Sequence, residues 1–156
     1  MGRSNIGYFR KPNHPLANYK PKVVQQEDPE AYGKKKPTWV FKRMDREGCW
    51  ALNLATTEER QGVFSRLSDF EGMTWNDIFS RCNNENHKID VEQLTKKAQD
   101  RMRELGIFED RIVSLRVTAT RRVYGLLYGS VCALLWYDNQ HGDNEECVCR
   151  SHKRFT

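Results

Sequence analysis

The feature that most constrains the fold is the stretch of residues 114–141, which reads as two or three β-strands in succession. Alternate residues of a strand point to opposite faces of a sheet, so residues 122–128 would place Arg122, Tyr124 and Leu126 on one face and Val123, Gly125 and Leu127 on the other. The next run, residues 131–137, is almost entirely apolar, which is typical of a central strand covered on both faces. A tight turn at Gly129 and Ser130 separates the two runs, so they predict an antiparallel pair, with residues 113–118 as a further strand.

Start signals predict three helices ahead of these strands. Thr56 and Glu59 have the spacing of a capping box, in which each side chain satisfies a backbone N–H of the first turn. Thr74 opens a second, short helix, and Asp90 opens a third that carries an apolar stripe and stops at Gly106. The three predicted helices span residues 56–70, 74–82 and 90–105.

The chain before these helices divides into an arm and a hairpin. Residues 1–36 contain four of the five prolines and eight Lys/Arg against three Asp/Glu, which is typical of an extended or disordered basic arm. Two strand-like segments inside residues 38–52, joined by a turn at residues 45–48, predict a β-hairpin. We therefore expect a single α+β domain over residues 37–156, in which three helices pack on a curved antiparallel sheet.

Charge and cysteine content indicate the kind of partner and the cellular compartment of such a domain. Residues 111–156 carry seven Lys/Arg against four Asp/Glu, so a polyanion would meet the predicted strands. Five cysteines, an odd number, and the lack of an apolar leader indicate a reducing cytosol. Since no apolar run approaches the roughly 20 residues of a membrane-spanning helix, we expect a soluble cytoplasmic protein with no membrane partner.

The predicted strands also carry side chains that could perform chemistry. These are Arg116, Arg122, Tyr124, Tyr137 and His141. Held on one sheet face, they would suit the handling of a phosphodiester without a metal ion, because a guanidinium can grip two phosphate oxygens and imidazole exchanges protons near neutral pH. Structural roles stay open for each: a strand arginine also pairs with helix carboxylates, and a tyrosine also packs half-buried with its hydroxyl hydrogen-bonded.

Short motifs in this region resemble known proteins. The runs Ser114-Leu115-Arg116 and Arg122-Val123-Tyr124, followed by a strand that ends near a histidine, are similar to the C-terminal half of the RelE/YoeB/ParE group of bacterial toxins. That similarity covers about residues 90–141. The chain also resembles an uncharacterised class of bacterial and phage proteins. The motifs shared with that class are His87-Lys88-Ile89 and residues 114–116, 122–125, 135–141 and 153–156.

The toxin resemblance implies a metal-independent endoribonuclease that cuts ribosome-bound mRNA, needs no cofactor and has an antitoxin protein as a partner. In such enzymes the ribose 2′-hydroxyl attacks the adjacent phosphate, which requires a cation over the phosphate and groups that move protons. By this resemblance Arg122 stabilises the phosphate charge and His141 moves a proton. The other expected members are Tyr124 and Arg116 in the catalytic set and Tyr137 on the RNA.

Further RNA contacts are expected from basic residues around this set. They are Arg121, His87, His152, Lys153 and Arg154. The chain departs from the toxin pattern in two ways. It continues for fifteen residues beyond His141, and no acidic residue that could act as a general base lies between Asp110 and Asp138.

Two other interpretations remain open. Cys147, Cys149, His152 and His141 are donor types that bind zinc, although alternate residues of a strand point apart, so a Cys-x-Cys pair needs a turn to converge. The same basic sheet could instead dock on nucleic acid or on an acidic protein without cleaving it. It would then act as a ParE-like inhibitor or as an interaction protein of phage or defence origin.

Overall fold

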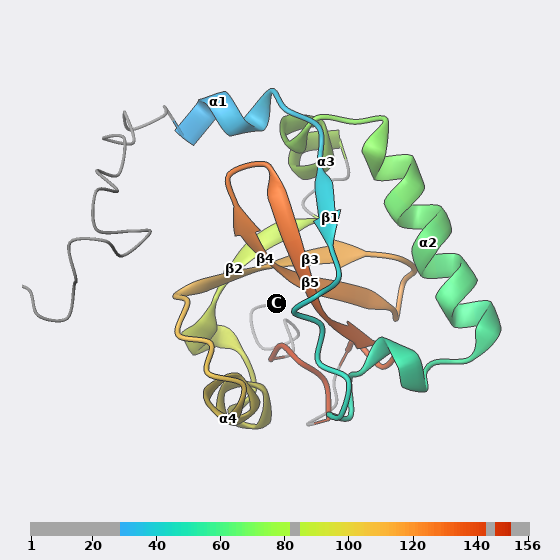
Figure 1. Ribbon diagram of the computed structural model, residues 1–156, viewed down its shortest axis with the longest axis vertical. Helices are drawn as coiled ribbons and strands as arrows, with labels where there is room; N and C mark the ends of the chain where they lie inside the picture. The colour runs from blue at the N-terminus through green and yellow to red at the C-terminus, as the bar shows by residue number, and fades with distance from the viewer. Residues whose placement is uncertain (1–28, 82–84, 143–145, 151–156) are drawn as a thin grey trace, which may run out of the picture.

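The fold is an α+β structure built around one open sheet. A computed structural model describes residues 29–81, 85–142 and 146–150 of the chain. Within these residues the helices are α1 (Pro29–Gly33), α2 (Thr57–Glu71), α3 (Trp75–Arg81) and α4 (Lys96–Glu104), and the strands are β1 (Thr38–Val40), β2 (His87–Asp90), β3 (Arg111–Arg116), β4 (Arg122–Tyr128) and β5 (Val131–Asp138). The sheet lies at the centre, with α2 along one side and α4 at the opposite lower corner (Figure 1).

The sheet is mixed, with strand order β1-β5-β4-β3-β2. The strands β3, β4 and β5 form the predicted antiparallel meander, and β2 pairs antiparallel with β3 at one edge. At the other edge β1 runs parallel to β5, with Thr38 opposite Val131. Gly129 has a φ of 62° in the turn between β4 and β5, a left-handed conformation that glycine adopts without steric cost.

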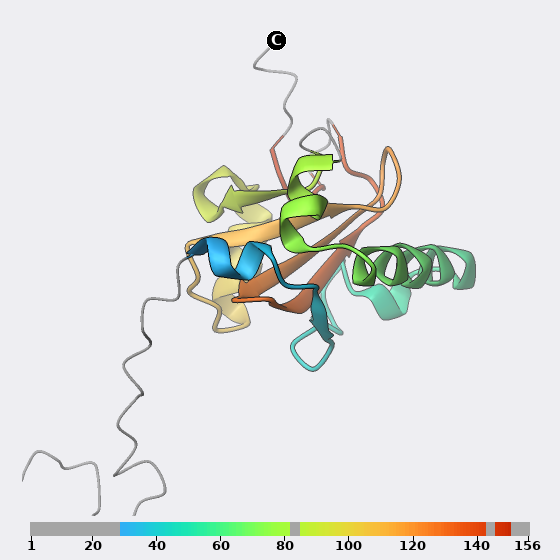
Figure 2. The same ribbon diagram turned by 90° about the horizontal axis from the view of Figure 1, so that it is seen from above.

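Each face of the sheet carries its own apolar cluster. On one face α2 and α3 pack against Val113, Leu115 and Val123. On the other face, α4 and the segment of residues 147–149 pack against side chains that include Ile112 and Tyr124. In both ribbon views α1 and α3 lie together at one end of the sheet (Figures 1 and 2). The central strands are therefore covered on both faces, as the apolar run of β5 predicts.

The predicted helix signals are present at the starts of α2 and α3 and at the end of α4. The Thr56 hydroxyl accepts from Glu59 N at 3.1 Å, and the Glu59 carboxylate accepts from Thr56 N at 3.4 Å, so the capping box of α2 is confirmed. Thr74 forms the corresponding pair of bonds with Asp77 at the start of α3. Gly106, with a φ of 72°, follows the last turn of α4.

The predicted N-terminal hairpin is wrong. The strand β1 pairs with β5, and the chain after the turn at residues 45–48 forms a 3-10 helix at Leu52–Leu54 rather than a second strand. The physical reason is the side chain of Asp45, which accepts hydrogen bonds from the backbone N–H groups of Glu47 and Gly48. Its carboxylate also binds Arg101 of α4 at 2.8 Å, which holds the turn beside α4 instead of along a partner strand.

The third predicted helix begins later in the chain than expected. Asp90 ends the strand β2, where its carboxylate accepts from Arg111 Nε at 2.8 Å across the sheet edge. A short 3-10 helix at Val91–Gln93 follows, and Thr95 is the actual N-cap of α4, because its hydroxyl accepts from Ala98 N. The strand β2 itself was not predicted.

The predicted arm contains a helix in its described part. The helix α1 occupies Pro29–Gly33, and the carbonyl of Lys35 accepts from Trp75 N at the start of α3. This end of the arm is therefore folded onto the domain rather than extended. Residues 1–28 lie outside the described residues.

Candidate functional site

Three of the predicted catalytic residues share one face of the sheet. In the β3–β4 register Ser114 lies opposite Tyr124, and Arg116 lies opposite Arg122. Directly opposed residues of antiparallel strands point to the same face. Arg116, Arg122 and Tyr124 therefore lie together, on the face that α4 and the C-terminal described segment cover.

His141 reaches this face from the loop that follows β5. Its Nδ1 lies 3.3 Å from the hydroxyl of Tyr124 and 3.2 Å from Sγ of Cys149, and the Tyr124 hydroxyl donates to that sulfur at 3.4 Å. Tyr124, His141 and Cys149 thus form a triangle of mutual polar contacts. The tautomer of the imidazole decides whether Nδ1 donates or accepts in it.

Arg122 is the buried cation beside this triangle. Only 8% of the residue is exposed, and its Nη1 donates to the carbonyl of Thr118 at 3.0 Å. Its Nε is buried with no hydrogen-bond partner among the described residues. Burial lowers the pKa of Arg122 from its usual range, yet a guanidinium keeps its proton near neutral pH. A buried donor without an acceptor costs about 1–3 kcal/mol. An anion that accepted a hydrogen bond from Nε would remove this cost, which would favour its binding.

The turn between β3 and β4 positions both Arg122 and His141. It is closed by backbone hydrogen bonds from Val117 N and Thr118 N to the carbonyl of Arg121. The Thr118 carbonyl holds the guanidinium of Arg122, and the Thr120 carbonyl accepts from His141 N at 2.8 Å. One turn therefore fixes the arginine and the histidine relative to each other, although they come from opposite ends of the β4–β5 hairpin.

Arg116 stands at the rim of the site and has an acidic neighbour. Its guanidinium forms an ion pair with Glu85, and both side chains are about one-third exposed. Its backbone N–H donates to Oδ1 of Asn86 at 2.7 Å, and the buried Asn86 side chain donates in turn to the carbonyl of Ile78. Glu85 partly neutralises the charge of Arg116 at the rim.

Asp138 closes the side of the site next to β5. It lies opposite Arg122 in the β4–β5 register and is 1% exposed. Burial raises its pKa above the usual range, while the bonds from Val148 N and Gln140 N, each 2.9 Å, and the charge of Arg122 act to lower it. The bond from Val148 secures the segment that carries Cys149 against Tyr124.

Two other predicted residues, Tyr137 and Arg121, are not brought into this group. Tyr137 lies opposite Val123 and packs on the α2 side of the sheet, where burial and then the carboxylate of Glu59 raise its pKa. The charge of Arg121 also acts on Glu59 and Tyr137, so this arginine lies on the α2 side as well. His87 does lie on the same face as Tyr124, because it is half-buried on the edge strand β2 directly opposite Ser114, which in turn lies opposite Tyr124.

The predicted zinc donors are not all brought together either. Cys149 contacts His141, whereas the Cys147 thiol donates to the carbonyl of Gly142 at 3.4 Å. Within residues 29–81, 85–142 and 146–150, no group of three His, Cys, Asp or Glu side chains is arranged to hold a metal ion. His152, Lys153 and Arg154 lie outside the described residues, so their predicted RNA contacts have no structural counterpart here.

Three members of the site were missed by sequence reasoning. Cys149 was considered only as a zinc ligand, and Asp138 and Glu85 were not considered as members of the site. Asp138 carried a usable signal in the sequence, because it directly continues the apolar run of residues 131–137. A carboxylate that continues a buried strand is rarely buried without hydrogen-bond or charged partners. Glu85 carried no such signal, because its place beside Arg116 depends on a strand, β2, that the sequence did not reveal.

No family model, no curated protein and no solved structure matches this chain. Among the helices of the described ranges, none has both the length and the apolar character needed to cross a membrane.

Proposed function

We propose that this protein is a metal-independent endoribonuclease whose substrate is mRNA on the ribosome. The observation that carries the proposal is the buried guanidinium of Arg122, whose Nε lacks an acceptor among the described residues and which shares a sheet face with Tyr124 and the imidazole of His141. A phosphate oxygen would satisfy that donor, and charge-assisted bonds to phosphate are among the strongest that a side chain makes.

The proposed reaction is a transesterification within the RNA chain. The 2′-oxygen forms a bond to phosphorus while the bond from phosphorus to the 5′-oxygen breaks, which leaves a 2′,3′-cyclic phosphate and a 5′-hydroxyl. The 2′-hydroxyl loses a proton and the 5′-oxygen gains one. His141 transfers protons through Nε2, since Nδ1 is held by Tyr124 and Cys149. Arg122 stabilises the charge that builds on the phosphate oxygens.

The remaining members of the face have supporting roles in this proposal. Tyr124 holds the imidazole, and burial raises its pKa well above the usual range, so its hydroxyl stays protonated as a donor. Arg116, at the exposed rim, guides the neighbouring phosphate of the chain.

The order of elements supports the same proposal. In the RelE/YoeB/ParE group a pair of helices precedes an antiparallel sheet; here the helices α2, α3 and α4, with β2 between α3 and α4, precede the antiparallel strands β3, β4 and β5. A protein of that kind would be inhibited by an antitoxin partner, and an acidic segment suits a face that carries Arg116 and Arg122.

A second candidate function is supported by a different observation. Tyr124 is fully buried and Arg116 is already paired with Glu85, so the face offers less open surface than an enzyme cleft usually does. On this account the chain is a non-catalytic module that docks on nucleic acid or on an acidic protein. Cleavage of RNA separates the two candidates.

The test compares matched arginine variants for RNA cleavage. Arg122→Gln removes the charge at the proposed phosphate site, whereas Arg103→Gln removes an exposed charge from α4, where Arg103 bonds Asp100. Each purified protein is incubated with translating ribosomes and with naked RNA, and the fragments are mapped. The proposal expects fragments from the native chain and from Arg103→Gln, with at least a hundredfold loss in Arg122→Gln.

Circular dichroism of the Arg122→Gln variant shows whether it is folded, and RNA binding by the native chain is measured beside cleavage. Saturable RNA binding by the native chain with no fragments from either substrate would favour the docking module and contradict the enzyme.

A further inference from the structure

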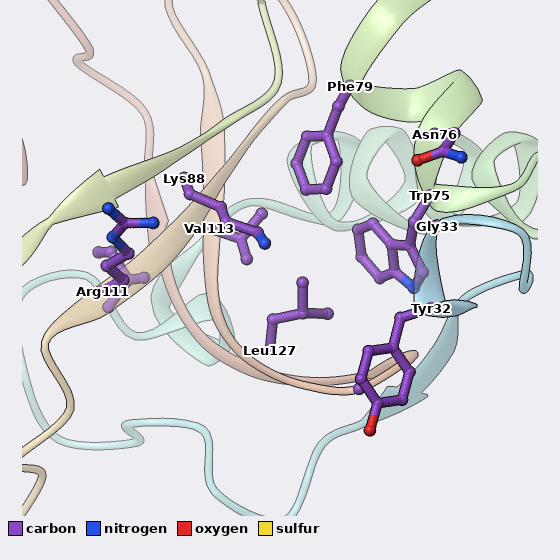
Figure 3. A pocket seen from close by; sticks show the side chains of 11 residues that line it. Tyr32, Gly33, Trp75, Asn76, Phe79, Lys88, Arg111, Val113 and Leu127 are labelled. Atoms are coloured by element: carbon purple, nitrogen blue, oxygen red, sulfur yellow. The ribbon is translucent and has the colours of Figure 1, made fainter. Parts of the chain in front are cut away.

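A pocket of about 340 Å³ lies on the opposite face of the sheet from Arg122, at the end where α1 and α3 meet it. Its floor is formed by Val113 and Leu127, which belong to the apolar cluster on the α2 and α3 side. Figure 3 shows three aromatic rings gathered on one side of this space and two cationic side chains on the other. The volume is within the range of small-molecule sites in proteins.

The aromatic wall comes from two helices. Trp75 and Phe79 of α3 are stacked, with ring centroids 5.5 Å apart and planes 25° from parallel, and Tyr32 of α1 stands beside them. Trp75 is buried and donates from Nε1 to the carbonyl of Ser130, so its ring is held in place behind the ring of Phe79. Phe79 and Tyr32 are half-buried and present ring surface to the pocket. Such rings offer stacking surface to another planar group.

The rim is positively charged. Lys88 of β2 and Arg111 of β3 line the pocket, and none of the described residues that line it is an aspartate or glutamate. Arg111 bonds Asp90 outside the lining. No carboxylate of the described residues lies within ion-pair distance of Lys88, whose Nζ is 5.9 Å from the centre of the Phe79 ring. The pocket therefore combines ring surface, an apolar floor and a cation that an anionic ligand could neutralise.

We propose that this pocket binds a nucleotide, with the base against Phe79 and Tyr32 and the phosphate on Lys88. A nucleotide joins a planar base to an anion within one ligand, which is the combination that the lining complements. The exposed amide of Asn76, which lies against Gly33, presents both a donor and an acceptor to the edge of a base. The inference does not rest on the proposed function, because the pocket and Arg122 lie on opposite faces of the sheet.

The test is titration of the full chain with nucleotides while its amide resonances are followed. The ligands are AMP, GMP, CMP and UMP, adenosine as the form without phosphate, and a riboadenylate tetramer. We expect saturable shifts at the amides of Gly33 and Gly129, which line the pocket, with adenosine about tenfold weaker than AMP. Tighter binding of AMP identifies a free nucleotide as the ligand, and tighter binding of the tetramer identifies a nucleotide of an RNA chain.

Two variants and one control locate the binding. Lys88→Glu reverses the rim charge on an exposed position, and Phe79→Leu removes the ring while keeping an apolar side chain. Each should lower the affinity about tenfold. The control is Lys96→Glu, an exposed lysine of α4 that bonds Asp100 away from the pocket, and it should bind like the native chain. Native-like spectra show that each variant is folded.

Failure of every ligand to give saturable shifts at Gly33 and Gly129 would overturn the inference. So would undiminished binding by folded Lys88→Glu.

Discussion

The hydroxyl of Tyr124 lies 3.3 Å from Nδ1 of His141, although 17 residues separate the two in the chain. The contact exists because β4 and β5 form one hairpin that returns the loop after β5 to the start of β4. Cys149 completes the contact from the C-terminal described segment, at 3.2 Å from the same nitrogen. The proposed reaction depends on this placement of the imidazole on the sheet face that carries Arg122.

Removing the Tyr124 hydroxyl should weaken catalysis more than stability. In Tyr124→Phe the ring still fills the core, but the imidazole loses one of the contacts that hold it. We expect kcat for RNA cleavage to fall about tenfold with KM unchanged, and the free energy of unfolding to fall by about 1 kcal/mol. Urea denaturation and single-turnover cleavage measure the two effects. A tenfold rise in KM with kcat unchanged would show that Tyr124 contacts RNA instead of positioning His141.

The ion pair of Asp45 and Arg101 should be the main acid-sensitive contribution to stability. Two oxygens of the buried carboxylate bond Arg101 at 2.8 Å each, and one of them also accepts from Trp136 Nε1 at 3.1 Å. These bonds, with that of Arg101 first, hold the pKa of Asp45 well below its usual range despite its burial. Asp45→Asn should therefore cost about 3 kcal/mol at pH 7, because it removes the buried charged partner of a partly buried guanidinium, whose remaining partner, Glu104, is exposed.

The pH dependence of this contribution has a defined sign. Since the pKa of Asp45 is lower in the folded than in the unfolded chain, the stabilisation is complete above about pH 5 and is lost as the pH falls below that. Urea midpoints at pH 7 and at pH 3 should therefore differ more for the native chain than for Asp45→Asn. Parallel loss of stability in both proteins would mean that other groups dominate acid unfolding.

Removing the carboxylate of Glu85 should strengthen RNA binding. Glu85 pairs with Arg116 at the rim, so Glu85→Gln leaves the arginine charge available to a phosphate. We expect about threefold higher affinity for single-stranded RNA and a steeper decrease of affinity with salt, by about one unit of slope. Glu71→Gln, an exposed change on α2, serves as the control. Unchanged affinity in Glu85→Gln would place the RNA elsewhere on the protein.

Thiol reactivity should separate the exposed Cys49 from the buried Cys132 and Cys149. Cys49 is exposed, whereas Cys132 and Cys149 are buried. Burial raises the pKa of Cys132 to about 12 and also raises that of Cys149, so neither forms thiolate at pH 8. Iodoacetamide with peptide mapping should label Cys49 rapidly and the other two only in urea. Rapid labelling of Cys149 in the native protein would show that its segment opens away from Tyr124.

Local signals in the sequence predicted the local parts of this fold. The meander of β3 to β5 follows from alternation and from the turn at Gly129, and the start of α2 follows from the spacing of Thr56 and Glu59. The parallel pairing of β1 with β5 joins residues more than ninety positions apart, and no local pattern reveals it. The third helix was misjudged because Asp90 resembles an N-cap but serves as the end of an edge strand.

The site was predictable to the same degree. Arg116, Arg122 and Tyr124 fall on one face because they alternate within strands whose pairing the sequence suggested. Tyr137 was expected on that face, but strand register decides the matter, and register places it opposite Val123 instead of Tyr124. Cys149 joins the site through tertiary contacts of the C-terminal segment with Asp138, which sequence patterns do not encode.

The most direct test of the central claim is cleavage of an RNA bearing a single 2′-deoxynucleotide at a site that the native protein cuts on translating ribosomes. The account predicts a 2′,3′-cyclic phosphate and a 5′-hydroxyl at that site in the all-ribose message, no cut at the deoxy position, and no cut of either message by Arg122→Gln or His141→Ala. Cleavage at the deoxy position, or unimpaired cleavage by either variant, would contradict it.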